Sequence, residues 1–255
     1  IVLTSNEFIP TEKTGFYTVT VSKNGNTSRT PDYNGLIKKF DQEHYHMAHP
    51  SRQVYRWNGS YYIPIQDVEI EGYAYERMNP SPSSTYFTEF KKRLMATNII
   101  TKENIVTLEG KLNLKNGVYD IVTKTLLPHS RQRFFTSQVD CDFVPGATCE
   151  RFKAWLKEIC SGDLEKVNAL LDFMAYAMAG ANISNELILV LTGEGQNGKT
   201  TFMKVMRKLF GTSMSSATAK EIADKNGKAK LEGKKICLME EVPSYKDMDL
   251  WEQLK

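Results

Sequence analysis

A glycine-rich loop, set between an apolar run and an amphipathic stretch, constrains the fold of this chain more than any other feature. Residues 193–200 read GEGQNGKT and match the pattern G-x-x-x-x-G-K-[ST] at every fixed position. The preceding residues 187–191 are all apolar, which is typical of a strand buried on both faces of a parallel sheet. Residues 200–210 have helical spacing, and Gly211 is placed to end that helix. The sequence therefore predicts a strand, a phosphate-binding loop and a helix.

Each fixed position of this pattern has a physical role in holding a polyphosphate. Glycines let consecutive backbone N–H groups point inward, and the following helix adds its positive N-terminal end. We expect Lys199 to reach the β- and γ-phosphates of ATP, and the Thr200 hydroxyl to hold Mg²⁺. The alternative is a connector that binds nothing, which the flanking strand and helix disfavour. The predicted nucleotide-binding residues are Gly193, Glu194, Gly195, Gln196, Asn197, Gly198, Lys199, Thr200 and Thr201.

Two adjacent glutamates, Glu240 and Glu241, follow a second apolar run at residues 236–239. In P-loop NTPases a carboxylate at this place helps to hold Mg²⁺. A neighbouring carboxylate can orient and deprotonate the attacking water. We assign Glu240 to the metal and Glu241 to the water, so the predicted catalytic residues are Lys199 and Glu241. An acidic strand end on the surface is the alternative, and which glutamate has which role stays open.

Composition limits the class of protein. Hydrophobic residues make up 41% of the 255 residues and charged residues 25%, as in globular domains and unlike disordered chains. The formal net charge is +3, which neither requires nor excludes a nucleic-acid partner. No apolar run reaches the roughly 18–20 residues that span a bilayer, so we expect no membrane partner. The four cysteines include no CxxC pair and are too few for a disulfide scaffold in a chain of this length, which favours a reducing compartment, so we expect a cytoplasmic location.

The order of these patterns predicts an α/β architecture with three regions. Residues 1–147 carry short alternating runs and turns that indicate an α+β region. Residues 148–182 have the spacing of two amphipathic helices. Residues 183–255 are predicted to form a P-loop NTPase core, which is incomplete because two strands make too small a sheet for such a domain.

Within the first region, five segments give specific expectations. Residues 54–63 predict a hairpin around Asn58 and Gly59, and residues 112–120 predict another around Asn116 and Gly117. A helix is expected near residues 84–97. Strands are expected near residues 119–127 and 132–143.

The motifs resemble those of superfamily-three helicases, above all the branch of phage, plasmid and poxvirus primase–helicases. Residues 193–202 resemble the G-x-G-x-N-G-K-[ST]-[ST]-[FL] loop of that branch, with Asn197 at the asparagine position. Residues 114–120 and 127–129, followed by the two helices, resemble the order of segments before its ATPase core. Residues 234–241 resemble its Walker B segment, and the similarity covers about residues 50–255.

This resemblance implies an AAA+-like motor that hydrolyses ATP to move along single-stranded or forked DNA in phage or plasmid replication. It also implies a homo-oligomeric ring, usually a hexamer. In this family a polar sensor residue and an arginine finger follow the Walker B strand, whereas this chain ends 14 residues after Glu241. We therefore expect a fragment of a longer protein that hydrolyses ATP poorly by itself.

Two other functions fit parts of the sequence. A small-molecule or nucleoside kinase also uses a P-loop, but it needs an acceptor pocket and an arginine-bearing lid, and we find no pattern for either. Residues 1–180 could instead form a DNA- or partner-binding module beside an inert ATPase fragment. Salt-dependent DNA binding by that part would favour the module.

Three weaker features have structural as well as functional interpretations. His44, His46 and His49 suggest a metal site, although no Cys or Glu cluster stands at ligand spacing. The lysine-rich residues 220–235 suggest either contacts to DNA phosphates or a solvated surface. The aromatic and basic residues of 52–62 suggest a stacking platform for single strands, although hairpin aromatics more often pack in a core.

Overall fold

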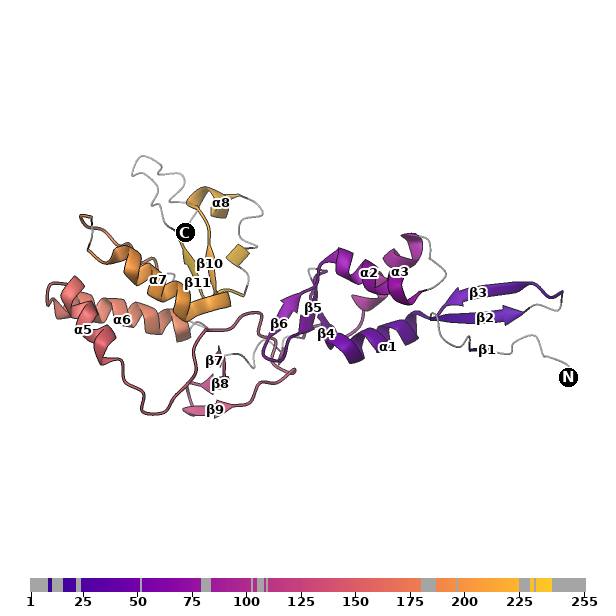
Figure 1. Ribbon diagram of the computed structural model, residues 1–255, viewed down its shortest axis with the longest axis horizontal. Coiled ribbons are helices and arrows are strands. Elements are labelled where there is room, and N and C mark those ends of the chain that lie inside the picture. Colours follow the sequence, from indigo (N-terminus) through magenta and orange to yellow (C-terminus); the bar gives the residue numbers. More distant parts are fainter. Residues whose placement is uncertain are drawn as a thin grey trace. The chain divides into compact units, whose positions relative to one another are not determined.

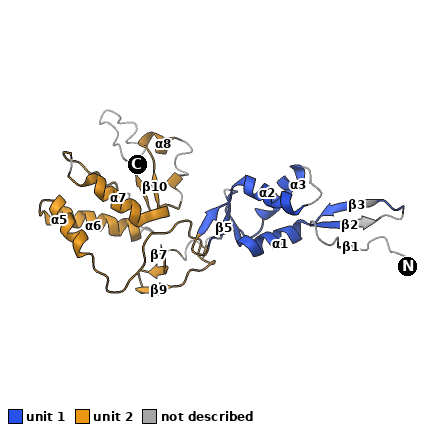
Figure 2. Ribbon diagram, viewed as in Figure 1, with its two compact units in different colours: residues 1–58, 62–102 blue, residues 59–61, 103–255 orange. Residues whose placement is uncertain are grey.

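The computed structural model of this chain is a mixed α/β protein with small sheets (Figure 1). It separates into two compact units, one of residues 1–58 and 62–102 and one of residues 59–61 and 103–255 (Figure 2). The boundaries predicted at 147/148 and 182/183 stay predictions. The structure describes residues 9–10, 16–21, 24–50, 52–78, 84–101, 103–104, 108, 110–179, 187–195, 197–224, 230–231 and 233–239.

The first unit pairs its described strands in two antiparallel sheets, β1-β2-β3 and β4-β5-β6. The predicted hairpin at residues 54–63 is confirmed, with Trp57 opposite Tyr62. The predicted helix at 84–97 is also confirmed, although it ends at Leu94. The elements are β1 Ile9–Pro10, β2 Tyr17–Val21, β3 Thr27–Pro31, α1 Tyr33–His44, β4 His46–Ala48, β5 Val54–Trp57, β6 Tyr62–Pro64, α2 Asp67–Arg77 and α3 Ser84–Leu94.

The core of the first unit lies between its three helices. Leu36 and Phe40 are one turn apart on α1, and Phe90 and Leu94 have the same spacing on α3. All four side chains are almost completely buried. The Phe40 ring meets the Tyr73 ring of α2 edge to face at 4.8 Å between centroids. These contacts join α1, α2 and α3 into one hydrophobic cluster.

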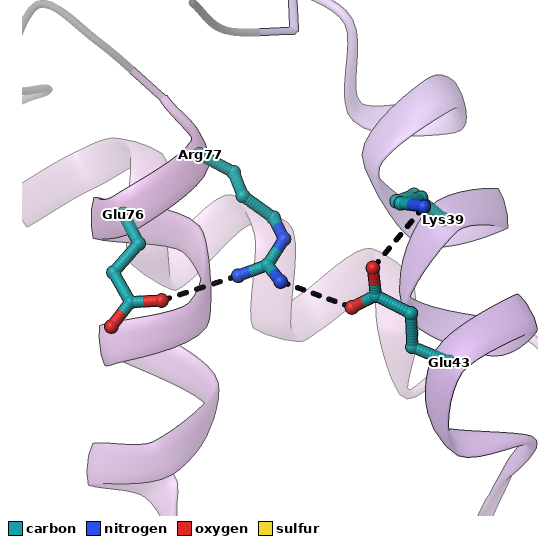
Figure 3. Close-up of polar contacts among 4 residues, drawn as sticks. All are labelled: Lys39, Glu43, Glu76 and Arg77. Atoms are coloured by element: carbon teal, nitrogen blue, oxygen red, sulfur yellow. Dashed lines mark hydrogen bonds and ion pairs between the residues drawn. The ribbon is translucent and has the colours of Figure 1, made fainter.

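A polar network joins α1 to α2 beside this core (Figure 3). The Glu43 carboxylate lies 3.2 Å from Lys39 Nζ and 3.1 Å from the Arg77 guanidinium, which also reaches Glu76 at 3.3 Å. The guanidinium carbon of Arg77 lies 3.8 Å from the centre of the Tyr73 ring. Desolvation raises the pKa of Glu43, but hydrogen bonds and the charges of Arg77 and Lys39 outweigh it, so the pKa is lower than usual.

The network makes the stability of the first unit depend on pH. Because the folded pKa of Glu43 is lower than its unfolded value near 4.5, the ionised carboxylate stabilises the fold above that value. This contribution is lost as the pH falls through the lower, folded value. We expect Glu43→Gln to reduce the free energy of unfolding by about 1 kcal/mol or less at about pH 7, because the pair is partly exposed.

Urea denaturation of the wild type and the variant between about pH 3 and pH 7 measures this difference. The difference should shrink as the pH falls below the unfolded pKa. Glu71→Gln, at an exposed position of α2, is the matched control and should change little. A difference that stayed constant over the whole range would contradict the role of the Glu43 charge.

The second unit combines an antiparallel sheet, β7-β8-β9, with a parallel pair, β10-β11. The helices predicted within residues 148–182 and 200–210 are confirmed as α5, α6 and α7. The elements are β7 Lys111–Leu114, β8 Gly117–Asp120, β9 Thr125–Leu127, α5 Glu150–Ile159, α6 Leu164–Ala179, α7 Lys199–Phe210, the 3-10 helix η1 Gly211–Ser213, β10 Met214–Ser216, α8 Ala219–Ala223 and β11 Ile236–Leu238.

The hairpin of β7 and β8 differs from the prediction by one position. Leu114 pairs with Gly117, so Lys115 and Asn116 form the turn and Gly117 begins β8. Gly117 has φ +151°, and a Cβ there would lie 2.6 Å from the Leu127 carbonyl oxygen. A glycine is required at this position because the backbone of β9 passes directly over it.

The strand predicted at residues 132–143 is wrong, since the structure describes these residues and shows no strand among them. Their backbone N–H groups donate hydrogen bonds to two different elements and do not form the regular pairing of a sheet. The Val139 N–H donates to the Asn113 carbonyl at 2.9 Å, and the Asp140 N–H donates to the Leu209 carbonyl near the end of α7 at 2.8 Å. This segment, which lies between β9 and α5 in the sequence, thus bonds to β7 through Val139 and to the end of α7 through Asp140.

The apolar run at residues 187–191 is also not the predicted buried strand. Leu187, Ile188 and Val190 are 55%, 52% and 45% exposed, whereas Leu189 packs against the core of the unit. A strand requires a partner backbone, and β10 and β11 pair with each other, Met214 opposite Ile236. That parallel pair, with α8 between its strands in the sequence, is compatible with a P-loop fold.

Three helices form the core of the second unit. Phe202, Met206 and Phe210 follow one another at helical spacing along α7 and are buried against Leu156 of α5 and Met174 of α6. In Figure 1, α5, α6 and α7 occupy the same part of this unit. None of the helices in the described parts of the chain has the length and apolar character that a bilayer crossing requires.

Candidate functional site

The glycine-rich loop leads directly into the first turn of α7. Gly198 is the residue before the helix, with φ +85°, and its carbonyl accepts the first helical bond from the Phe202 N–H at 2.8 Å. The N–H groups of this first turn have no partner within the helix, and they lie at its positive end. Because Phe202 and Met206 anchor the buried side of α7, these free donors are held in a fixed place.

The ammonium group of Lys199 lies inside the loop. It donates to the carbonyl oxygens of Gly193 at 2.9 Å and Glu194 at 2.8 Å, and to Asn197 Oδ1 at 2.6 Å. These acceptors match the three donors of an ammonium group, and none of the three acceptor atoms carries a formal charge. The loop therefore closes around a cation whose charge is not neutralised by these partners, at the positive end of a helix.

Two glycines of the loop combine a positive φ with a close neighbour. Gly193 has φ +143°, and a Cβ there would clash with the Asn197 amide nitrogen. Gly198 has φ +85°, and a Cβ there would lie 2.7 Å from Cγ2 of Ile159 in α5. At Gly195, in contrast, a Cβ would meet nothing within 4 Å. The first and third glycines thus allow the close approaches that shape the loop.

The structure brings some of the predicted site residues together and leaves others untested. Gly193, Glu194, Asn197 and Lys199 are joined by the contacts of the lysine. Gly195 is exposed in the loop, and Thr200 and Thr201 are exposed in the first turn of α7. Gln196, Glu240 and Glu241 lie outside the described residues, which include β11 up to Leu238 and the following Met239. The assignments of Thr200, Glu240 and Glu241 to magnesium and water stay predictions.

A groove beside the loop was not predicted from the sequence. It has a volume of about 490 Å³ and lies between the first turns of α5 and one side of α7. Phe152 and Trp155 of α5 and Thr201 and Val205 of α7 are among the residues that line it. The amphipathic spacing predicted for residues 148–182 places Phe152 and Trp155 on the apolar face of α5, and both side chains are half-buried. The sequence signal that could have indicated this groove was the presence of two large aromatic residues near the start of an amphipathic helix.

The three histidines make structural contacts. His46 is fully buried, with Nε2 3.0 Å from the Thr97 hydroxyl and Nδ1 3.1 Å from Asp41 Oδ1, and burial lowers its pKa. The His44 ring meets the Phe40 ring edge to face at 4.7 Å, and His49 contacts the Tyr55 ring. Among the described residues, no group of three His, Cys, Asp or Glu side chains is placed to hold a metal ion.

Three lysines of the basic stretch 220–235 bond within the second unit. Lys230 lies 2.7 Å from Glu221, and its hydrogen bond is the largest cause that lowers the Glu221 pKa to about 2. Lys234 Nζ donates to the Thr212 carbonyl at 2.6 Å. Lys235 Nζ donates to the Met178 carbonyl at 2.9 Å, and burial lowers the pKa of Lys235. These contacts favour a structural role for the three lysines.

The aromatic residues of the β5–β6 hairpin pack inward. Tyr55 and Tyr62 are buried, and the Trp57 ring lies 5.1 Å from the Tyr62 ring between centroids. The Arg56 guanidinium lies 3.5 Å from the Glu69 carboxylate. This arrangement is that of a hydrophobic cross-strand cluster, and it differs from an open row of stacking aromatics.

Two protein families match separate ranges of this chain. Residues 36–161 match the family described as D5 N terminal like, which is the N-terminal domain of phage and viral primase–helicase-like proteins. Because residues 36–161 are similar to that family, we call them the D5 N-terminal-like region. Residues 191–255 match a family of unknown function, DUF5906, and this range begins two residues before the loop and includes α7. The first match supports a relationship to replication proteins of the primase–helicase class.

The loop contains a crowded glycine, Gly198, and an uncrowded one, Gly195, and alanine substitutions at the two positions test its geometry. Gly198→Ala places a Cβ on a left-handed residue and against Ile159, so we expect the free energy of unfolding to fall by about 1–3 kcal/mol. Gly195→Ala is the matched control and should change it by less than about 0.5 kcal/mol. Urea denaturation measures both variants.

A double variant separates the effect of the contact with Ile159 from the effect of the left-handed backbone at residue 198. Adding Ile159→Ala to Gly198→Ala removes the clash but not the strain, so the combined loss should be smaller than the sum of the single losses. Equal losses for the two glycine variants would show that this loop geometry is wrong.

Proposed function

We propose that this chain is part of a phage or viral replication protein of the primase–helicase type, which binds ATP and Mg²⁺ at the loop of residues 193–201. In the complete protein, ATP hydrolysis drives movement along single-stranded or forked DNA within a homo-oligomeric ring. The observation that carries the proposal is the Lys199 ammonium, held by three neutral acceptors at the start of α7. The D5 N-terminal-like region ahead of it supports the replication context.

The chemistry of the loop fits a polyphosphate. The Lys199 ammonium donates to neutral oxygens, and a charge-assisted bond to a phosphate oxygen is shorter and stronger than a neutral one. An entering phosphate therefore gains at least one such bond in exchange for a carbonyl or amide contact. The free N–H groups of Lys199, Thr200 and Thr201 lie at the positive helix end and add further donors.

The residues around this loop have separate roles in the proposal. The Thr200 hydroxyl and the Glu240 carboxylate hold Mg²⁺, which neutralises charge on the phosphates when it is bound. The Glu241 carboxylate orients the attacking water and accepts its proton. Lys199 stabilises the negative charge that develops on the phosphate oxygens.

Removing the Lys199 ammonium tests the assignment. In the full-length protein we expect Lys199→Ala to lower the rate of ATP hydrolysis about 100-fold, as for other preorganised donors at developing charge. Lys204→Ala, on the exposed face of the same helix, is the matched control and should keep the wild-type rate. Steady-state assays with and without single-stranded DNA measure both rates, with circular dichroism to check the fold.

An unchanged rate in Lys199→Ala would refute the proposal. The same assay separates a motor from a P-loop kinase. A motor releases inorganic phosphate, and DNA raises its rate of ATP hydrolysis. A kinase transfers the phosphate to an acceptor molecule, and DNA does not change its rate.

A further inference from the structure

We propose that the groove between α5 and α7 binds the base and ribose of the nucleotide whose phosphates lie at the loop. This inference rests on the proposed function and deepens it, because it assigns the part of the site that recognises the nucleoside. Trp155 provides the surface on which the base stacks, and Thr201 and Val205 form the opposite wall.

One wall of the groove starts at the residue that follows Thr200 of the proposed phosphate site. Thr201 lines the groove and directly follows Thr200, in the helical turn whose free N–H groups face the phosphates. Val205 lies four residues farther along α7, which is about 6 Å along the helix axis. A ligand whose phosphates sit at the start of α7 can therefore place its next groups along this side of the helix.

The position of α5 along α7 is fixed at the loop. Because Gly198 has no Cβ, Ile159 of α5 packs directly on it, and Trp155 lies one turn earlier on the same helix. Trp155 and Thr201 then line the same groove. The contact between Ile159 and Gly198 thus holds α5 close to α7 one turn away from Trp155.

The size and chemistry of the groove fit a nucleoside. Its volume of about 490 Å³ is large enough for a nucleoside, and the groove is largely open to solvent. The Phe152 and Trp155 rings lie 5.8 Å apart between centroids at 31° to each other, and both are half-buried. Each ring therefore packs partly on the core and leaves part of its apolar surface open, and such surfaces stack with nucleobases.

The test compares ATP with inorganic triphosphate, which has the phosphates but no nucleoside. Isothermal titration calorimetry on the full chain gives the dissociation constants of both ligands with Mg²⁺. We expect Trp155→Ala to weaken ATP binding about tenfold, the effect of losing one base–aromatic stack, and to leave triphosphate binding within about twofold. Lys199→Ala should weaken the binding of both ligands.

Two further variants distinguish a loss of nucleoside binding from a folding defect. Val205→Trp fills the groove from the side of α7 and should weaken ATP binding without changing triphosphate binding. Trp57→Ala removes a partly buried tryptophan from β5 of the first unit and should leave both affinities unchanged. Thermal unfolding of each variant shows whether it is folded under the conditions of the titration.

Each outcome decides the inference. If ATP and triphosphate bind the wild type equally and Trp155→Ala changes neither, the groove does not recognise the nucleoside, although the loop still binds phosphate. If Trp155→Ala and Val205→Trp weaken both ligands equally, the groove has a structural role and the inference is wrong. If the wild type binds neither ligand, the proposed function fails and the inference fails with it.

Discussion

The Lys199 ammonium and its three acceptors organise the candidate site. They connect Gly193 at the start of the loop to Asn197 near its end. Lys199 is the first residue of α7, and from there its side chain reaches back to the carbonyl oxygens of Gly193 and Glu194. The buried side of α7, from Phe202 onward, therefore supports a polar site on its exposed first turn.

Features set by neighbouring residues were predictable from the sequence. The helix at 199–210 follows from the spacing of Phe202, Met206 and Phe210, each of which faces the core. The β5–β6 hairpin follows from an Asn-Gly turn between β-branched and aromatic runs. The loop motif is equally local, since its glycines and its lysine act on groups within a few residues.

Features that depend on distant partners were not predictable in the same way. The apolar run at 187–191 has the composition of a buried strand, but composition does not supply the hydrogen bonds that define one. Residues 132–143 have strand-like alternation, yet Val139 bonds to β7 and Asp140 bonds to the end of α7. The groove was missed for a related reason. The spacing of Phe152 and Trp155 shows which face of α5 is apolar, but not that α7 leaves part of that face open.

The boundary between the two family matches runs through the candidate site, between α5 and α7. The D5 N-terminal-like range, 36–161, includes α5, whereas the loop and α7 lie in the second range, 191–255. Ile159 packs on Gly198, and Trp155 shares the groove with Thr201, so residues from both ranges meet along these two helices. A nucleotide bound as proposed would touch both ranges at once, through its phosphates and its base. Its binding would then depend on how α5 packs against α7, which links the D5 N-terminal-like region physically to the proposed ATPase chemistry.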